Sequence, residues 1–363
     1  MRTEAERLLK LYSETPGASG NEELVRKVFC QELNGHAFSA DRTGCVLAAR
    51  DGDPKDGPRV MLTAHMDEVG FMVQNITKTG FIEIVPLGGW WPHVVLAQGV
   101  IVMASSGRAI PGCVASIPPH QLGEGAASKV MALDKMSIDI GGDSREQVME
   151  EFGVQLGDSI VPATKFKSLA HPDRFLGKAF DNRVGMALLT QSMCALKKKK
   201  LPNQLLGVAT VQEEVGCRGA VTASALAKPD VALVLEGPPA DDTPGMNRDD
   251  AQGALGEGVQ LRVMDPRALS SRRLVDFVVS HAKAAGIDHQ VTVRRGGGTD
   301  ASAIHLHDQG VPSIVLGVPT RYIHSHHSIL QITDYLEAMK LIDVLVRAFD
   351  AEAVNDLTDF LRA

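Results

Sequence analysis

The chain has 363 residues, of which 44% are hydrophobic and 22% charged, an ordinary globular composition with enough residues for two domains. Its net charge of −7 and the lack of a large basic patch argue against a general binder of nucleic-acid phosphates, and no apolar run is long enough to span a membrane. The five cysteines form no C-x-x-C pair and the N-terminal residues do not resemble a signal peptide, so the sequence argues against a disulfide framework and predicts a cytoplasmic protein.

The first part of the chain alternates helix and strand signals. Apolar residues at helical spacing predict a helix over residues 3–13, which Pro16–Gly20 ends. A second helix is expected after residue 21. Two apolar runs, 45–49 and 59–64, then predict strands, and the second leads directly into a histidine and two acids.

From about residue 70 the pattern changes to short β-like runs separated by Gly and Pro turns. A short acidic stretch at residues 145–152 is the exception and has a helical period. The expected strands cover residues 81–85, 94–96, 100–104 and 136–140. We therefore expect residues 68–165 to form a small inserted β-rich domain, either PDZ-like or a β-barrel.

After residue 166 strands and helices alternate again. Predicted strands cover residues 205–211, 231–235, 291–294 and 312–318. Predicted helices begin at residue 180 and after residue 300, and cover residues 220–226, 270–285 and 333–349. This alternation is typical of an α/β fold in which helices flank a central mixed sheet. Residues 1–67 and 166–363 are therefore predicted to form one discontinuous α/β domain.

Five side chains that could bind a metal are expected at the C-terminal ends of strands or in the loops just after them: His65, Asp181, Glu214, Glu236 and His324. Open α/β sheets bind ligands outside the carboxyl ends of their strands. Two histidines with three carboxylates suit a pair of zinc, cobalt or manganese ions, whereas an all-oxygen set would suggest magnesium or calcium. A carboxylate that bridges two such ions would form a hydrolytic centre.

Two adjacent acids, Glu213 and Glu214, follow the apolar run at residues 205–211. An unpaired buried carboxylate is costly, so two acids at the end of a buried strand indicate a function. Because adjacent residues point in different directions, one carboxylate can face a metal while the other faces the substrate. The alternative is a solvated pair in a strand-to-helix loop.

Each candidate ligand also has a purely structural interpretation. Asp181 with Asn182 could cap a helix. His324 is one of three histidines in residues 324–327, any of which could lie on the surface, and Glu236 could be an ordinary loop acid. The occurrence of all five at the ends of predicted strands favours the metal site.

Five short segments, in this order, resemble the motifs of one family. They are His65-Met66-Asp67-Glu68-Val69-Gly70, Asp181-Asn182-Arg183-Val184-Gly185, Gln212-Glu213-Glu214-Val215-Gly216, Gly298-Thr299-Asp300-Ala301 and Pro319-Thr320-Arg321-Tyr322-Ile323-His324-Ser325. The chain resembles the tetrahedral (TET) aminopeptidases of metallopeptidase family 42, which include glutamyl aminopeptidases and proteins once labelled cellulase M. The resemblance covers nearly the whole chain. It implies a metal-dependent aminopeptidase, a hydrolase that removes N-terminal residues from short peptides.

The resemblance also implies a role for each site residue. Two divalent ions would share one bridging carboxylate, and each would have one histidine and one further carboxylate: Asp181 as the bridge, His65 with Glu236, and Glu214 with His324. Glu213 would be the general base that takes a proton from a metal-bridging water and passes it to the leaving amine. Asp67 would hydrogen-bond the His65 imidazole and so set its tautomer.

The inserted segment resembles the dimerisation domain of the family. This implies homodimers that assemble into a tetrahedral dodecamer around an inner chamber, with short peptides as substrates and neither nucleic acid nor membrane as a partner. The segment Pro118-Pro119-His120 would then present His120 or Gln121 to a neighbouring subunit's active site. The alternative is a rigid exposed loop.

The sequence leaves the substrate preference and the metal open. The family most often has Asp at the position of Glu236, and the longer side chain can change denticity and metal preference. A pocket for an acidic first residue needs a cation, and Arg248, Arg294 and Arg295 are conceivable.

Two other functions compete with the aminopeptidase. A related metal-dependent amidohydrolase, of the aminoacylase or carboxypeptidase kind, would share the metal ligands but act on different substrates. A non-catalytic assembly protein would keep the fold without the chemistry, yet this chain retains Glu213 with all five ligand positions. A glycosidase is disfavoured, because glycosidases typically use two metal-free carboxylates.

Overall fold

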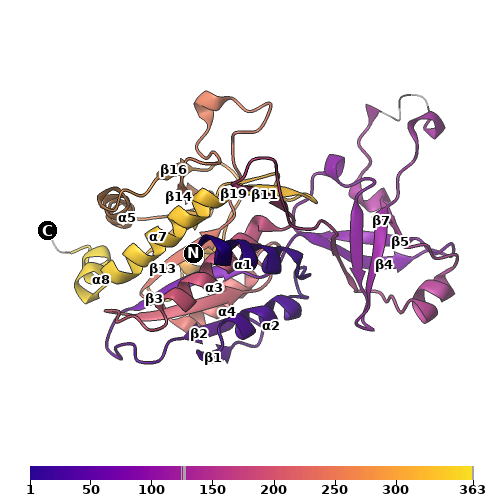
Figure 1. The fold of residues 1–363 in the computed structure, drawn as a ribbon. Coiled ribbons are helices and arrows are strands. Elements are labelled where there is room, and N and C mark those ends of the chain that lie inside the picture. Colours follow the sequence, from indigo (N-terminus) through magenta and orange to yellow (C-terminus); the bar gives the residue numbers. More distant parts are fainter. Residues whose placement is uncertain (124, 126–127, 362–363) are drawn as a thin grey trace.

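The computed structural model describes residues 1–123, 125 and 128–361. It contains a larger α/β body and a β-barrel that stands to one side of it (Figure 1). The helices nearest the two chain ends, α1 (Arg2–Glu14) and α8 (Ala351–Thr358), both belong to the larger body. In the described part of the chain, no helix is long and apolar enough to cross a membrane.

The larger body is built on a mixed sheet with the order β1-β2-β12-β3-β13-β17-β14-β15, to which β16 adds beside β14. Its strands are β1 (Ala37–Ala40), β2 (Val46–Ala49), β3 (Arg59–His65), β12 (Gln204–Thr210), β13 (Val231–Glu236), β14 (Val259–Asp265), β15 (Ala268–Leu269), β16 (His289–Val293) and β17 (Ser313–Gly317). Four central neighbours, β12, β3, β13 and β17, are parallel to one another. Their carboxyl ends therefore meet at one edge of the sheet.

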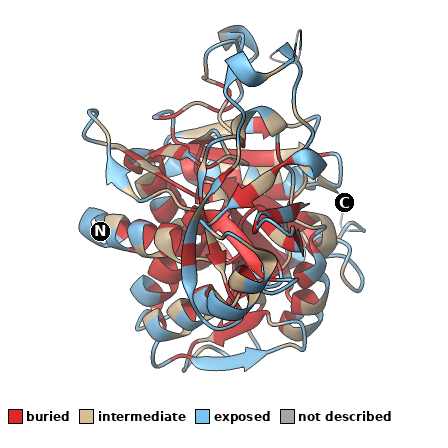
Figure 2. Ribbon diagram, turned by 90° about the vertical axis from the view of Figure 1, so that its right-hand side faces the viewer, coloured by how far each residue is buried: buried red, intermediate tan, exposed pale blue. Residues whose placement is uncertain are grey.

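Helices cover both faces of this sheet, which explains why the central strands are buried along nearly their whole length (Figure 2). Helix α3 (Phe180–Leu196) packs on β3, β12 and β13 together with α1 and α7 (Ile332–Ala348). Helices α4 (Arg218–Ala227) and α6 (Ala301–Ile304) pack on β12, β13 and β17. The remaining helices are α2 (Glu23–Glu32), beside α3, and α5 (Arg272–Ala284), beside α7. The predicted α/β fold with a central mixed sheet is confirmed.

The inserted β-rich segment is a closed barrel with the strand order β4-β5-β8-β7-β6-β9. Its strands are β4 (Gly70–Ile76), β5 (Ile82–Leu87), β6 (Gly99–Met103), β7 (Ala109–Val114), β8 (Ser137–Asp139) and β9 (Ser159–Pro162). Alternate residues point inward, and the barrel has a hydrophobic core of its own that includes Phe71, Ile84 and Val102. Pairing of β9 with both β4 and β6 closes the barrel and leaves no free edge.

One prediction inside the insert is wrong, and one is right in place but differs in the type of helix. Residues 94–96 are not a strand: a 3-10 turn, Pro92–Val94, occupies the site, because Pro92 lacks an N–H and suits the first position of a turn. The predicted helical stretch at residues 145–152 is present, and most of it, Gln147–Glu151, is a π-helix. Strands β4, β7 and β9 were not predicted.

A second, small sheet joins the insert region to the C-terminal part of the larger body. It has the order β10-β11-β19-β18, with β10 (Lys167–Ser168), β11 (Arg174–Gly177), β18 (Thr320–Arg321) and β19 (Ser328–Gln331). The loop between β18 and β19 contains His324. Pairing of the two strands holds this loop near the carboxyl edge of the main sheet.

A buried ion cluster ties the N-terminal segment to the loop that follows β3. Glu68 accepts hydrogen bonds from Lys178 and from Arg183, whose Nη2 lies 3.1 Å from Glu68 Oε1. All three side chains are at most 2% exposed. Arg183 also donates to the carbonyls of Tyr12 and Gly17, so this cluster anchors the segment after α1 beside His65.

Replacing Glu68 by Gln should destabilise the fold by about 3–5 kcal/mol, because it leaves two buried cations without their carboxylate. Burial already lowers the pKa of Lys178 to about 8, so this lysine would lose its proton first. Urea unfolding measures the change. The matched control is Asp343→Asn, which breaks the exposed Arg347–Asp343 pair and should cost at most about 1 kcal/mol. Equal effects of the two substitutions would contradict the prediction.

Candidate metal centre and active site

The structure gathers the predicted site residues at the carboxyl edge of the parallel strands. His65 is the last residue of β3 and Glu236 the last residue of β13. Glu213 and Glu214 lie in the loop after β12, near the start of which Gln212 has a φ of 56°. The two remaining candidates, Asp181 and His324, come from the start of α3 and from the β18–β19 loop.

Asp181 lies between the two histidines. Its Oδ1 is 3.3 Å from His65 Nε2, and its Oδ2 is 3.4 Å from His324 Nε2. Asn182 takes the capping position instead, because its Oδ1 accepts a hydrogen bond from the N–H of Gly185. The Asp181 carboxylate therefore faces the site with both oxygens, each directed at a different imidazole.

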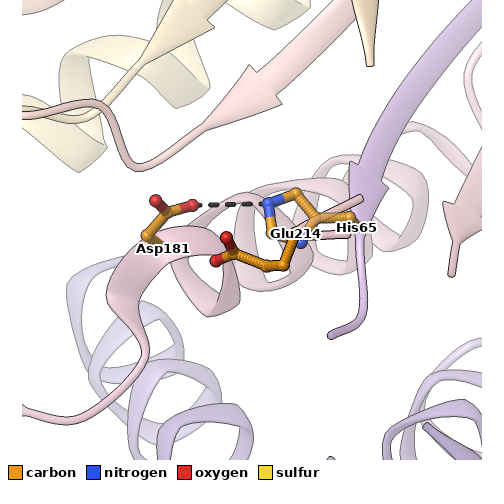
Figure 3. A group of neighbouring side chains, drawn as sticks. All are labelled: His65, Asp181 and Glu214. Atoms are coloured by element: carbon orange, nitrogen blue, oxygen red, sulfur yellow. Dashed lines mark ion pairs between the residues drawn. The ribbon is translucent and has the colours of Figure 1, made fainter. Parts of the chain in front are cut away.

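The two further carboxylates flank these contacts. His324 Nε2 lies 3.3 Å from Glu214 Oε2, and His65 Nε2 lies 3.7 Å from Glu236 Oε2. Figure 3 shows the His65 imidazole with the Asp181 and Glu214 carboxylates, which come from three different elements. The second oxygens, Glu214 Oε1 and Glu236 Oε1, are buried without a hydrogen-bond partner.

This donor set fits two divalent cations. Three carboxylates and two imidazoles make N···O contacts of 3.3–3.7 Å with one another, and two buried carboxylate oxygens lack partners that a cation would supply. The Asp181 position suits a bridge, with one histidine and one further carboxylate on each side. The donor chemistry of the site therefore suits divalent metal ions.

The pKa values of the metal-free site reflect the same excess of negative charge. Burial, followed by the nearby Asp181 charge, raises the pKa of Glu214 to about 8, and burial raises that of Glu236 well above its usual range. Burial is the largest single influence on His324 and lowers its pKa, but the hydrogen bond to Asp181 and the charges of Glu214 and Asp181 together outweigh it, so the pKa rises to about 9. Without metal, the site therefore holds extra protons at neutral pH.

We expect the metal-free protein to lose stability as the pH rises from about 5 to about 9. Glu214 keeps its proton up to about pH 8 in the folded state but loses it near its ordinary value of 4.5 when unfolded. The pKa of His324 is likewise higher in the folded state, about 9, than its ordinary value of 6.5. The folded state thus binds more protons in this window, and each titrating group costs at most about 1.4 kcal/mol per pH unit. Melting temperatures of chelator-treated protein measure this, and metal-loaded protein should lack the fall.

Asp67 contacts both the His65 imidazole and the backbone of the two glutamates. The His65 Nδ1 atom lies 3.1 Å from the Asp67 carbonyl oxygen and 3.3 Å from its Oδ1. The same carboxylate accepts the backbone N–H groups of Glu213 and Glu214, at 3.0 and 3.1 Å, and the hydroxyl of Ser19. Asp67 therefore fixes the position of the His65 imidazole relative to the loop that carries Glu213 and Glu214. The sequence did not indicate the hydrogen bonds from Asp67 to this loop.

A cavity of about 440 Å³ opens beside these residues. Its wall includes Arg262, on β14, and Arg267, which sequence reasoning missed. Arg262 is 6% exposed, its Nε has no hydrogen-bond partner, and its Nη1 lies 3.8 Å from Asp265. Of the arginines suggested by the sequence, Arg294 is paired with Asp241. The side chain of Arg248 lies outside the described part of the structure.

The barrel also reaches the site. A Cβ added to Gly89 would lie 3.2 Å from His324 Nδ1, so the Gly88-Gly89 turn approaches that imidazole closely. His326 is buried beside Trp90, and His327 lies near Thr164. His120 is exposed in the 3-10 turn Pro119–Gln121, and its role toward a neighbouring subunit stays a prediction.

Comparisons with known proteins point to one family. Residues 44–341 match the model of the M42 glutamyl aminopeptidase family. The chain is 36% identical to a glutamyl aminopeptidase of Lactococcus lactis subsp. cremoris, over 97% of this chain and 98% of that one. A TET aminopeptidase from a marine sediment Thaumarchaeota archaeon has a TM-score of 0.93 and 38% identity, covering 98% and 100% of the two chains. The Pyrococcus horikoshii TET1 peptidase, which can assemble into a tetrahedron or a large octahedral shell, has a TM-score of 0.83 and 29% identity, covering 94% and 99%.

Proposed function

The chain belongs to the M42 glutamyl aminopeptidase family and is a hydrolase that acts on peptide bonds, and we propose that it is a two-metal aminopeptidase that prefers acidic N-terminal residues of short peptides. The observation that carries the two-metal part is the Asp181 carboxylate, whose oxygens face His65 and His324 separately. Asp181 would be shared by both ions, His65 and Glu236 would hold one of them, and Glu214 and His324 would hold the other. Zinc or cobalt, and also manganese, suit such a set of nitrogen and oxygen ligands.

Bound ions would polarise the scissile carbonyl, lower the pKa of a water molecule and help to hold the free α-amine. The chain's own part is proton transfer and positioning. Glu213 Oε2 lies 3.7 Å from His65 Nε2, so this carboxylate borders the space between the ligands. There it can take a proton from the attacking water and pass it to the leaving amine. Asp67 keeps Glu213 in place through the backbone N–H.

The preference for an acidic residue rests on Arg262. The Arg262 guanidinium is nearly buried, its Nε has no hydrogen-bond partner and its ion pair with Asp265 is long, at 3.8 Å, so an anion in the cavity would lower the cost of burying its charge. The cavity that it lines adjoins the proposed metal ligands, where the side chain of an N-terminal residue would lie. A carboxylate on that side chain would accept charge-assisted hydrogen bonds from Arg262.

A panel of aminoacyl-p-nitroanilides tests this function on protein freed of metal and refilled with cobalt, zinc or manganese. We expect metal-dependent release from free-amine substrates, fastest for Glu or Asp. Arg262→Met should lower the ratio of kcat/KM for Glu over Leu by about 10- to 100-fold, the effect of a lost charged hydrogen bond. Arg262→Lys should keep part of the preference, and Arg267→Met, an exposed position, should change it less.

Three outcomes would contradict parts of this proposal. Release from an N-acetylated substrate would favour the aminoacylase branch of the related amidohydrolases. A fastest reaction with a neutral or basic residue would exclude the acidic preference while leaving the aminopeptidase in place. No release with any substrate and any metal would reopen the non-catalytic alternative.

The proposal extends to assembly. Family members form large homo-oligomers such as tetrahedra, and we propose that the barrel mediates dimers that build a dodecamer. Exposed apolar residues on or beside the barrel, Trp91, Ile117 and Leu156, support it as an interface. Light scattering measures the mass of the assembly directly. A mass equal to that of one chain would exclude the proposed dimer and dodecamer. A cytoplasmic location is included, since the five free cysteines suit a reducing compartment.

A further inference from the structure

A second group of potential metal ligands lies next to the site just described. Glu213, Cys217 and Asp300 each offer one ligand atom, and these atoms lie within 4.8 Å of one another. Cys217 is 5% exposed and Asp300 1% exposed. The two-metal proposal gives no role to Cys217 or Asp300.

The carboxylate of Glu213 stands between the two groups. Its Oε2 faces His65, at 3.7 Å from Nε2, whereas its Oε1 lies 3.4 Å from the sulfur of Cys217. The loop from Gln212 to Cys217 folds back on itself, with the N–H of Cys217 donating to the Glu213 carbonyl. The thiol is therefore held on the side of Glu213 that is turned away from His65.

Asp300 supplies an independent sign that a cation is missing. One of its carboxylate oxygens accepts a hydrogen bond from the hydroxyl of Thr210, but Oδ1 is buried without any partner. A buried carboxylate oxygen without a partner carries an uncompensated desolvation cost. A cation bound between Asp300 and its two neighbours would remove that cost.

We propose that Glu213, Cys217 and Asp300 form a third cation site, specific for a thiophilic divalent ion such as zinc or cadmium. One thiolate and two carboxylates, with a water as fourth ligand, match the tetrahedral preference of zinc. Magnesium and calcium, which prefer oxygen ligands, should not compete. Binding displaces the thiol proton of Cys217 to the solvent as the sulfur–metal bond forms. Cys217 and Glu213 line the 440 Å³ cavity, which gives the ion a route in.

Occupancy of this site has a consequence that rests on the proposed role of Glu213. An ion held by Oε1 withdraws charge from the carboxylate that is meant to accept the proton of the attacking water. Excess zinc should therefore inhibit the enzyme, while the first two ions activate it. The site itself depends only on the three side chains and not on this role.

Cadmium titration of metal-free protein tests the site without using activity. A thiolate–cadmium charge-transfer band in the ultraviolet should appear, and equilibrium dialysis should find about three ions per chain. Cys217→Ser keeps a hydrogen-bond donor next to Glu213 but is a poor ligand, so it should lose the band and bind about two. Cys113→Ser removes an exposed thiol of the barrel and should keep both the band and the third ion. The proposal would be overturned if Cys217→Ser showed the same charge-transfer band and bound the same number of cadmium ions as the unaltered protein.

Zinc inhibition then separates the two proposals. Each protein is normalised to its own rate with two equivalents of zinc, and Cys217→Ser should need at least tenfold more zinc for half-inhibition. A Cys217-dependent band together with this shift supports both the third site and Glu213 as the base. The band and the third ion without any inhibition support the site and count against the role of Glu213.

Discussion

Replacing Glu213 by Gln should lower kcat by about 10²- to 10⁴-fold, the usual contribution of a general base, while the protein still binds its two catalytic ions. Gln has nearly the same shape, so the loop after β12 should keep its hydrogen bonds to Asp67. The loss therefore reports the missing proton acceptor. Steady-state kinetics on the best aminoacyl substrate, with metal content from mass spectrometry at two added equivalents, provides the measurement.

The neighbouring residue is the matched control for this substitution. Glu214→Gln should lower metal content first and activity as a result, because Glu214 faces His324 at 3.3 Å and not the approach of the water. Added metal should restore part of the activity of Glu214→Gln and none of that of Glu213→Gln. If Glu213→Gln kept the original rate, or if its defect were repaired by metal, Glu213 would not be the base.

The α/β body was predictable because its central strands are continuous apolar runs with charged residues only at their ends. The β13 strand, Val231–Glu236, is buried throughout and ends in an acid. Strand β14 was missed because buried polar residues, Gln260 and Arg262, interrupt its apolar pattern. Their burial depends on tertiary contacts, such as the hydrogen bond from Gln260 to the Pro239 carbonyl, which no local pattern shows.

The same distinction separates the parts of the site that could and could not be predicted. Residues at strand ends, such as His65 and Glu236, follow from strand prediction and the parallel sheet alone. The proximity of Cys217 to Glu213 needs left-handed backbone at both ends of a loop, with φ values of 56° at Gln212 and 52° at Cys217. The orientation of Arg262 toward the cavity likewise depends on the antiparallel pairing of β14 with β17.

Asp181→Asn should remove the bridge, and the affinity of both ions should fall by roughly 10²- to 10⁴-fold, equivalent to the 3–5 kcal/mol for breaking a buried charge pair. A carboxamide has one oxygen where Asp181 directs two, so it can satisfy one histidine at most. Equilibrium dialysis with zinc and the catalytic rate at limiting metal should fall together. Unlike Glu214→Gln, this variant should weaken the binding of both ions at once.

A second readout needs no metal. The Asp181 carboxylate contributes to the pKa of about 9 for His324, so in metal-free Asp181→Asn this pKa should fall toward 6.5. Histidine proton signals followed by NMR across the pH range measure the shift. Asp300→Asn is the control, because Asp300 is also a buried acid, 1% exposed, but lies outside the proposed pair of ion sites. It should leave the first two ions and the His324 pKa nearly unchanged, whereas full retention of both ions by Asp181→Asn would exclude Asp181 as their bridge.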